Sequence, residues 1–382
     1  MGNVVVREMK VVWLGLRGFP GVMGGVEAHA EKICPRLVQL GCDTEVIARS
    51  PYVPAGTTEF RGVRVRRLWA PRSKYLESFI HSFLGVLYCA VKRPDIVHIQ
   101  AIGPAIMTPL ARLLGLRVIV THHGPDYDRQ KWGGLAKLVL RRGEAWGMRF
   151  ANARISISET IEAAMGAHYG VECVRIPNGV DLPALPGSAE RLEQFGLVAR
   201  HFVLLVSRLV PEKRHEDLIR AFSIAQIPGW KLALVGSSDH PDRYTARINE
   251  LAQTTPNVVT TGFQSGETLK QLFAHAGLFV LPSSHEGLPI ALLEALSYGL
   301  PVLASDIPAN REVGLAEEQY FALGDVEQLA ERFRVFARSP NGSVDRDQVR
   351  RWVAERYSWD AASRTTLQVY HGVLGHTGQP AL

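Results

Sequence analysis

The chain has 382 residues, of which 46% are apolar and 21% are charged, the proportions of a soluble globular protein. This length exceeds what one compact core supports and predicts two domains, and no apolar run reaches the ~18 residues that a membrane-spanning helix needs. The net charge of +6 combines +9 in residues 1–182 (24 Lys and Arg against 15 Asp and Glu) with −3 in residues 183–382 (19 against 22), so we expect the first half to meet an anionic partner.

Short β-branched runs alternate with helical patterns along the first half of the chain. This alternation predicts βαβ units around a parallel sheet. The expected strands are residues 9–15, 44–48, 63–68, 95–100, 117–121 and 153–157.

The alternation breaks at the turn-rich segment 176–181, whose Asn178-Gly179-Val180-Asp181 we interpret as a hinge without ligand contacts. We therefore predict three parts: a Rossmann-like domain over 1–182, a second Rossmann-like domain over 183–356, and over 357–382 a terminal helix followed by a loose tail. The strands of the second domain are expected at 202–206, 231–235, 258–260, 278–281 and 301–304.

Cysteine usage indicates no metal or disulfide framework. The cysteines are scattered without CxxC spacing, and the apolar part of the N-terminus, residues 11–15, is too short for a signal peptide. We expect a cytoplasmic protein. The four cysteines are Cys34, Cys42, Cys89 and Cys173.

Two segments at expected strand ends in the first half carry candidate site residues. Gly24 and Gly25 precede a helix, where glycines let a ligand approach the backbone and the helix N-terminal amides. His122 and His123 end another strand before a Gly-Pro pair, and since neighbouring residues of a strand point to opposite faces, only one of them can face a site.

A third segment supplies fixed positive charge. Arg208 follows the first strand of the second domain and Lys213 comes five residues later, which places two cations at the carboxyl edge of the sheet. Cations there can stabilise the charge that develops on a leaving diphosphate.

The fourth segment combines two carboxylates with a helix N-terminus. Glu286 and Glu294 are eight positions apart, and Gly287 and Pro289 mark a tight turn with Pro289 as the expected first helical residue. Free amides at such a helix start suit a phosphate, and each carboxylate can accept hydrogen bonds from a vicinal diol.

Taken in this order, the four segments resemble those of retaining glycosyltransferases of the GT-B fold, family 4 in particular, in which two Rossmann-like domains face a central cleft. The resemblance implies that Glu286 contacts the transferred sugar, Glu294 the ribose, and Arg208 and Lys213 the diphosphate. It further implies that His123 lies near the donor sugar. By the same resemblance, the domain over 1–182 binds the acceptor, the domain over 183–356 binds the donor, and the helix within 357–382 crosses back to the first domain. The implied donor-binding set is completed by Gly24, Gly25, Phe263, Gly287, Leu288, Pro289 and Ile290.

The resemblance also implies a nucleoside-diphosphate sugar as donor substrate, no cofactor and no metal. Asp126-Tyr127-Asp128 has the Asp-x-Asp pattern that binds a metal in the GT-A fold, but Asp345-Arg346-Asp347 repeats the pattern elsewhere in the chain. We interpret Asp126-Tyr127-Asp128 as loop or acceptor-side residues.

A basic amphipathic segment over 129–150 admits two interpretations. Its basic residues interleave with aromatic and aliphatic ones, as in helices that lie at an anionic membrane surface. The alternative is a helix that packs by its apolar side and leaves a basic face in solvent. The basic residues are Lys131, Lys137, Arg141, Arg142 and Arg149, and the apolar ones are Trp132, Leu135, Leu138, Val139, Trp146 and Phe150.

The function that we expect is transfer of a hexosyl or rhamnosyl unit to a glycan acceptor, lipid-linked and part of a bacterial surface polysaccharide, by an enzyme peripheral to the inner face of the membrane. A nucleotide-sugar epimerase of the same architecture is the first alternative. A non-catalytic nucleic-acid-binding protein is the second, although no recognisable nucleic-acid-binding motif supports it.

Overall fold

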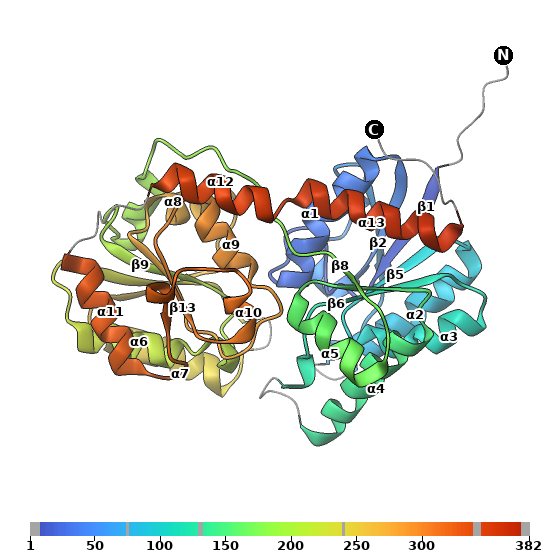
Figure 1. Cartoon of the computed structure of the whole chain (residues 1–382), viewed down its shortest axis with the longest axis horizontal. Helices are drawn as coiled ribbons and strands as arrows, with labels where there is room; N and C mark the ends of the chain where they lie inside the picture. The colour runs from blue at the N-terminus through green and yellow to red at the C-terminus, as the bar shows by residue number, and fades with distance from the viewer. Residues whose placement is uncertain (1–7, 74–75, 129–132, 239–240, 339–344, 376–382) are drawn as a thin grey trace, which may run out of the picture. The chain divides into compact units, whose positions relative to one another are not determined.

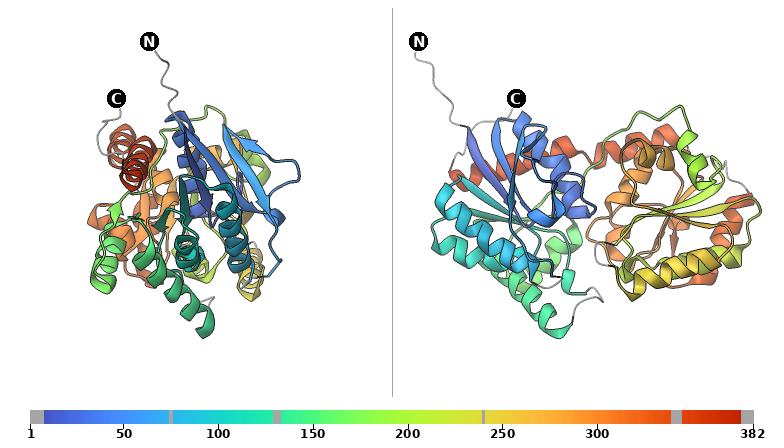
Figure 2. Two further views of the ribbon diagram at one scale, coloured as in Figure 1. Left: turned by 90° about the vertical axis from the view of Figure 1, so that its right-hand side faces the viewer. Right: turned by 180° about the vertical axis from the view of Figure 1, so that it is seen from behind.

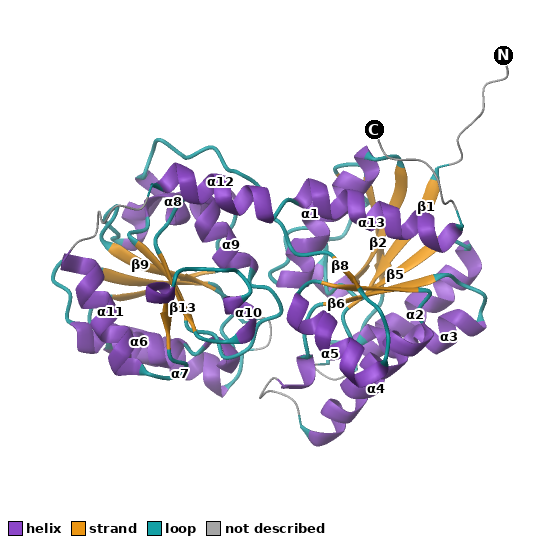
Figure 3. Ribbon diagram, viewed as in Figure 1, coloured by secondary structure: helices purple, strands orange, loops and turns teal. Residues whose placement is uncertain are grey.

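The computed structural model describes residues 8–73, 76–128, 133–238, 241–338 and 345–375. The chain forms two compact units (Figure 1): unit 1 comprises residues 1–178 and 359–382, and unit 2 comprises residues 179–358. Each unit consists of one sheet with helices on both of its faces (Figures 2 and 3), which is the doubly wound architecture predicted from the alternating pattern.

Unit 1 contains an eight-stranded sheet in the order β3-β4-β2-β1-β5-β6-β7-β8. All neighbours are parallel except β3 and β4. The central strands are continuous apolar runs because helices cover both faces. The strands are β1 Met9–Leu14, β2 Cys42–Arg49, β3 Glu59–Phe60, β4 Val63–Leu68, β5 Ile96–Gln100, β6 Val118–His122, β7 Ala153–Ser156 and β8 Val174–Arg175.

The helices of unit 1 form two layers. From β1 the chain moves toward one edge of the sheet through α1, and from β4, β5 and β6 it moves toward the other edge through α2, α3 and α4. Right-handed crossovers therefore place α1 on one face, where it packs against α13, and α2, α3 and α4 together on the other. The helices are α1 Gly25–Gln39, α2 Glu77–Lys92, α3 Thr108–Leu113, α4 Gly134–Phe150, α5 Glu159–Tyr169 and α13 Trp359–Leu374, with the short 3-10 turns η1 Ser50–Tyr52, η2 Pro104–Met107 and η3 Asp126–Asp128.

The last helix, α13, completes the core of unit 1. The Tyr370 hydroxyl lies 2.7 Å from Nδ1 of His98, whose Nε2 lies 2.7 Å from the Thr121 hydroxyl. The Trp359 ring packs edge-on against His29 at 5.5 Å. Because Trp359 and Tyr370 are both buried, α13 is an integral part of this core.

Unit 2 contains a six-stranded, fully parallel sheet in the order β11-β10-β9-β12-β13-β14. Its strands are β9 Phe202–Val206, β10 Lys231–Val235, β11 Val258–Gly262, β12 Leu278–Leu281, β13 Val302–Ser305 and β14 Tyr320–Phe321. Its helices are α6 His215–Ala225, α7 Arg243–Thr254, α8 Gly266–His275, α9 Ile290–Ser297, α10 Pro308–Arg311, α11 Val326–Arg338 and α12 Arg346–Arg356, with η4 Glu190–Phe195, η5 Pro211–Lys213 and η6 Glu317–Gln319.

Every strand predicted from the sequence is present, with ends that differ by two residues or fewer. The prediction missed β3, β8 and β14, each only two residues long, because so short a strand has no readable periodicity. The four cysteines are unpaired thiols, and none of the described helices is long and apolar enough to span a bilayer.

Candidate functional site

The site residues predicted in unit 2 follow strands whose carboxyl ends meet at one edge of the sheet. Arg208 and Lys213 follow β9, Glu286 follows β12, and Phe263 follows β11. In the sheet, β9 and β12 are direct neighbours although some 70 residues separate them in the chain, as the pairing of Phe279 with Leu204 shows. Ligands of doubly wound sheets bind outside this edge.

Lys213 and Glu286 are in direct contact. The ammonium of Lys213 forms an ion pair with Oε1 of Glu286, and the two side chains are 18% and 11% exposed. The structure thus brings together one predicted phosphate-binding cation and the carboxylate predicted to contact the sugar. A partly buried ion pair at a strand edge places both charges where water screens them less than at an open surface.

Backbone contacts join the two loops that carry this pair. The Ser284 amide donates to the backbone carbonyl of Glu212 at 2.8 Å, and the Ser284 hydroxyl donates to the same oxygen at 3.3 Å. Glu212 is itself buried. These bonds fix the spacing of the segments that precede Glu286 and Lys213, and the sequence patterns gave no indication of them.

Gly236 lies beneath the Arg208 loop and is a second feature that the sequence patterns missed. Its φ is +140°, and a Cβ at this position would lie 1.8 Å from the carbonyl oxygen of Ser207. Leu209 donates its amide to Ser237 at 3.0 Å, so the backbone of β9 stays tied to β10 beyond the strand. Only glycine permits this approach, and a glycine directly after an apolar strand was the available signal.

His215 supports the same loop from below. Its Nε2 lies 3.0 Å from the Ser207 hydroxyl and its Nδ1 lies 3.2 Å from the Tyr244 hydroxyl. Burial, together with the nearby charge of Lys213, lowers the pKa of His215 to about 3. His215 is therefore a neutral hydrogen-bonding support, and the positive charge of this loop comes from Arg208, Lys213 and Arg214, of which Arg214 pairs with Asp217.

Helix α9 begins where the amide-lined turn was predicted, with one correction. Pro289 caps the helix instead of occupying its first position, because its ψ of 97° is extended and α9 begins at Ile290. The Pro289 carbonyl accepts the amides of Leu292 and Leu293, and no side chain caps the helix. Gly287 is half-buried and Leu288 is buried, so the turn is held by packing.

The two other donor-side candidates lie at different places. Glu294 is half-buried on α9 near Tyr298, and burial and then the carboxylate of Glu294 raise the pKa of that phenol. Phe263 follows β11 at the edge of the sheet, two strands away from β9, and its ring is exposed. A surface ring at this edge has the freedom to stack on a ligand.

In unit 1, the predicted glycine loop is fixed by a buried carboxylate. Oε1 of Glu27 accepts the Arg17 amide at 3.0 Å. Gly24 has a φ of +155°, and a Cβ there would lie 2.0 Å from Oε2 of Glu27, whereas a Cβ on Gly25 would meet nothing within 4 Å. Gly24 is thus required by the loop itself, and Gly25 faces open space.

His123 lies at the end of β6 as a neutral imidazole. Its Nε2 donates to Oε1 of Gln100 at 2.8 Å, and its ring lies edge-on to His29 at 5.0 Å. Burial, and then the neighbouring His29, holds the pKa of His123 well below its usual range. A neutral ring held at a strand end can take part in hydrogen bonding without adding charge.

His122 points to the other face of the sheet, as the alternation of strand side chains requires. Its Nδ1 accepts the Gly124 amide at 3.1 Å, so the ring proton is on Nε2 and is donated to Glu144 at 2.7 Å. The hydroxyls of Tyr169 and Tyr127 donate to the same carboxylate at 2.9 and 3.3 Å. Burial opposes ionisation of Glu144, but these hydrogen bonds outweigh it and lower its pKa. The network anchors the loop that follows His123.

The Asp-x-Asp segment and Asn178, the first residue of the hinge, occupy structural positions in unit 1. Asp126-Tyr127-Asp128 forms the turn η3, and Tyr127 reaches inward to Glu144. Asn178 is buried, and its Oδ1 lies 3.0 Å from Nδ1 of His29. The described residues contain no group of three or more His, Cys, Asp or Glu side chains suited to hold a metal ion.

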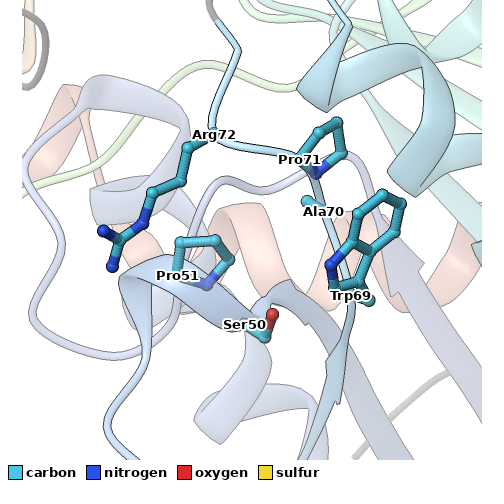
Figure 4. Close-up of a pocket in the computed structure, with 6 residues that line it drawn as sticks. All are labelled: Ser50, Pro51, Trp69, Ala70, Pro71 and Arg72. Atoms are coloured by element: carbon cyan, nitrogen blue, oxygen red, sulfur yellow. The ribbon is translucent and has the colours of Figure 1, made fainter.

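An open pocket of about 400 Å³ lies at the carboxyl ends of β2 and β4 (Figure 4). The indole of Trp69, 61% exposed, lies on one side of Pro51, and the guanidinium of Arg72 lies on the other. A flat apolar ring beside a multiple hydrogen-bond donor suits a ligand with both apolar faces and hydroxyls. The pocket is lined by Ser50, Pro51, Trp69, Ala70, Pro71 and Arg72.

Both halves of the sequence match known families. Residues 23–183 match the family model described as Glycosyltransferase Family 4, and residues 190–369 match the one described as Glycosyl transferases group 1. Among curated proteins, glycogen synthase of Mycobacterium tuberculosis is 25% identical over 97% of each chain. A GDP-mannose-dependent alpha-(1-6)-phosphatidylinositol monomannoside mannosyltransferase of the same organism is 29% identical over 92% of this chain and 96% of that protein. An uncharacterized glycosyltransferase of Methanocaldococcus jannaschii, MJ1607, is 30% identical over 44% of each chain.

Solved structures share the fold over the whole chain. Sucrose-phosphate synthase from Thermosynechococcus elongatus superposes with a TM-score of 0.83 at 22% identity and covers 97% of this chain and 100% of its own. Alr3699/HepE of Anabaena, crystallised with UDP and glucose, superposes with a TM-score of 0.78 at 18% identity and covers 96% of this chain and 100% of its own.

Proposed function

Because this chain is a GT-B glycosyltransferase of the family 4 type, we propose that it transfers a sugar from a nucleoside-diphosphate sugar to a hydroxyl of a lipid-linked glycan, with retention at the anomeric carbon and without a metal. The observation that carries the donor assignment is the ion pair of Lys213 and Glu286 at the carboxyl edge of the unit 2 sheet. The cation suits the diphosphate of a sugar nucleotide, and the carboxylate beside it suits the hydroxyls of the attached sugar.

The proposed donor-binding residues have different roles according to their charge. Arg208 and Lys213 hold the diphosphate and stabilise the negative charge that develops as it leaves. Glu286 accepts hydrogen bonds from hydroxyls of the transferred sugar, and Glu294 accepts them from the ribose. Gly287, Leu288, Pro289 and Ile290 present the uncapped start of α9 to the donor, and Phe263 contacts the base.

The proposed step is a substitution on the face from which the leaving group departs. The acceptor oxygen bonds to the anomeric carbon as the bond from that carbon to the diphosphate breaks, and the hydroxyl proton passes to an oxygen of the leaving diphosphate. The cations make a separate metal unnecessary. We propose that the neutral ring of His123 makes a hydrogen bond near the sugar. The Gly24-Gly25 loop lets the donor approach the backbone closely.

For the acceptor we propose the pocket beside Trp69 in unit 1. The indole supplies an apolar platform for a sugar ring, and Arg72 supplies donors for hydroxyls or for an acidic substituent. A lipid-linked glycan in surface-polysaccharide assembly is consistent with the basic character of this half of the chain. The names of the relatives and structural neighbours include both GDP-mannose and UDP, which leaves the base and the sugar, hexose or rhamnose, for experiment.

One incubation tests this function against epimerisation. The protein is incubated with UDP-, GDP-, dTDP- and ADP-sugars, with and without a glycan acceptor, in buffer containing a chelator, and the products are followed by NMR. We expect transfer only when acceptor is present, with the anomeric configuration of the donor. Conversion of the donor to its epimer without acceptor, inversion, or arrest by the chelator would each contradict the corresponding part of the proposal.

A further inference from the structure

Helix α2 directs its large apolar side chains away from the core of unit 1. Its buried positions are Glu77, His81, Ser82, Gly85, Val86 and Cys89, a largely polar and small set. The outward stripe repeats every three or four residues, the spacing of one helix face. It consists of Leu76, Phe79, Phe83, Leu87 and Val91.

Helix α4 has the same inside-out character. Gly143 and Gly147 face inward, where a Cβ would lie 2.1 Å from the Ile102 carbonyl oxygen and 2.8 Å from Cβ of Ala105, so small residues let the helix approach η2 closely. Of its large apolar residues, only Leu140 and Met148 are buried, and the others form an outward stripe: Leu135, Leu138, Val139, Trp146 and Phe150. The apolar residues named in the sequence interpretation are therefore not the side by which the described part of this helix packs, and Lys131 and Trp132 lie outside the described residues.

The two stripes belong to one layer of helices. Both helices pack against η2 and α3 on the same face of the sheet, as Figures 1 and 2 show. Leu113, at the end of the intervening α3, is also exposed. We call the ten outward side chains of α2 and α4 the α2–α4 face; each is between 38% and 83% exposed. Exposed apolar side chains that gather on neighbouring helices are typical of an interaction site.

The segment that carries this face has more positive than negative charges. Arg142 and Arg149 lie within the α4 stripe itself, three or four residues from Val139 and Trp146. Between residues 76 and 150, the described part of the chain carries eight Lys and Arg against five Asp and Glu, and two of these acids, Glu77 and Glu144, are buried.

We infer that the α2–α4 face docks on an anionic lipid bilayer. Phe79, Phe83 and Trp146 enter the boundary between head groups and acyl chains, and Arg142 and Arg149 pair with lipid phosphates. A second copy of this chain is the weaker candidate, since a two-fold interface would bring the same arginines of both copies together. The inference rests on the proposed function, because an enzyme with a lipid-linked acceptor works at a membrane surface. Binding to vesicles can nevertheless be measured independently of sugar transfer.

Vesicle co-sedimentation tests the inference on the full-length protein. The protein is mixed with vesicles of phosphatidylcholine alone, or of phosphatidylcholine with phosphatidylglycerol, at low and high salt. Two double variants change the face, Phe83→Ser with Trp146→Ser, and Arg142→Glu with Arg149→Glu. Because these side chains are exposed, neither variant removes core packing. Leu40→Ser and Arg364→Glu are matched controls, since both residues are exposed near the other helix layer of unit 1.

We expect the protein to bind the anionic vesicles, with weaker binding at high salt. Each double variant should lower that binding about tenfold or more, and the controls should leave it unchanged. Binding equal in variants and wild type, or no binding to either vesicle, would overturn the inference. So would a wild-type dimer in sedimentation velocity that the double variants convert to monomer.

Stabilisation by nucleotide separates this inference from the proposed function. The double variants should keep the nucleotide response of the wild-type protein, because the altered residues belong to unit 1 and the proposed phosphate cations to unit 2. If nucleotide does not stabilise the wild-type protein, the proposed function is contradicted, whereas the result with vesicles is unaffected.

Discussion

Lys213 and Glu286 form an ion pair across two loops that follow neighbouring strands of the unit 2 sheet. The pair is largely shielded from solvent and rests on loops tied together by the bond between Ser284 and Glu212. Each charge has its proposed ligand group, diphosphate for the ammonium and sugar hydroxyls for the carboxylate. Under the proposed function, the two side chains keep each other oriented until the donor separates them.

Removing either charge should stop sugar transfer. We expect Lys213→Ala and Glu286→Gln each to lower kcat/KM by about 100-fold or more, the scale of losing a transition-state contact. Circular dichroism should show an unchanged fold. Glu331→Ala, which removes an exposed ion pair with Arg334 on α11, is the control and should transfer sugar normally. Full activity in both site variants would end the assignment.

Acid should destabilise unit 1 through its buried imidazoles. Burial lowers the pKa of His29 to about 4, despite an opposing hydrogen bond from Asn178, so the unfolded state binds the proton first as the pH falls below about 6.5. The unfolding free energy should fall from there to about pH 4, by roughly 3 kcal/mol for His29 alone. Denaturant titrations at several pH values should show a shallower dependence in His29→Gln than in the wild type.

The control for this pH dependence is His168→Gln, which changes an exposed histidine of the same unit. It should reproduce the wild-type curve. The explanation based on His29 is wrong if the unfolding free energy of His29→Gln changes with pH as steeply as that of the wild type between pH 4 and 6.5.

Neighbouring glycines of unit 1 should respond differently to alanine. Gly24→Ala combines a positive φ with a clash against Glu27 and should cost about 1–3 kcal/mol of stability. Gly25→Ala meets no protein atom and should leave the melting temperature unchanged, while the added methyl group raises the KM for the donor if this loop approaches it. Equal melting temperatures for the two variants would contradict the geometry.

Trp69 should determine acceptor affinity. Trp69→Ala removes the proposed sugar platform and should raise the KM for the acceptor about tenfold, with little change in kcat or in the KM for the donor. Trp69→Phe should restore part of the affinity. The exposed Trp146, changed to Ala and assayed with a water-soluble acceptor, provides the comparison. An unchanged acceptor KM in Trp69→Ala would remove this pocket from the site.

The sequence predicted the strands well because their apolar runs are uninterrupted and both faces of each sheet are covered. It also placed Lys213 and Glu286 after strands, and parallel strands end at a common edge. It could not predict their contact, since nothing in the local pattern shows that β9 and β12 are neighbours. The close approach of Gly236 to Ser207 could not be predicted for the same reason, because Ser207 follows a different strand, β9.

The sequence also did not show which side of a helix faces the core. Periodicity identifies the apolar side of a helix, and the usual expectation is that this side faces the core. In α4 the inward positions include the small Gly143 and Gly147, and most of the large apolar residues point outward. Which side packs depends on how closely the helix must approach its neighbours, and that distance is a property of the assembled unit.

Thermal unfolding with nucleoside diphosphates tests the central claim most directly. UDP, GDP, dTDP and ADP are each added to the wild type and to Lys213→Ala. The account predicts that at least one nucleotide, at about 100 times its Kd, raises the wild-type melting temperature by roughly 5 to 10 °C, and that this rise largely disappears in Lys213→Ala. No stabilisation by any of the four, or an equal rise in the variant, would contradict it.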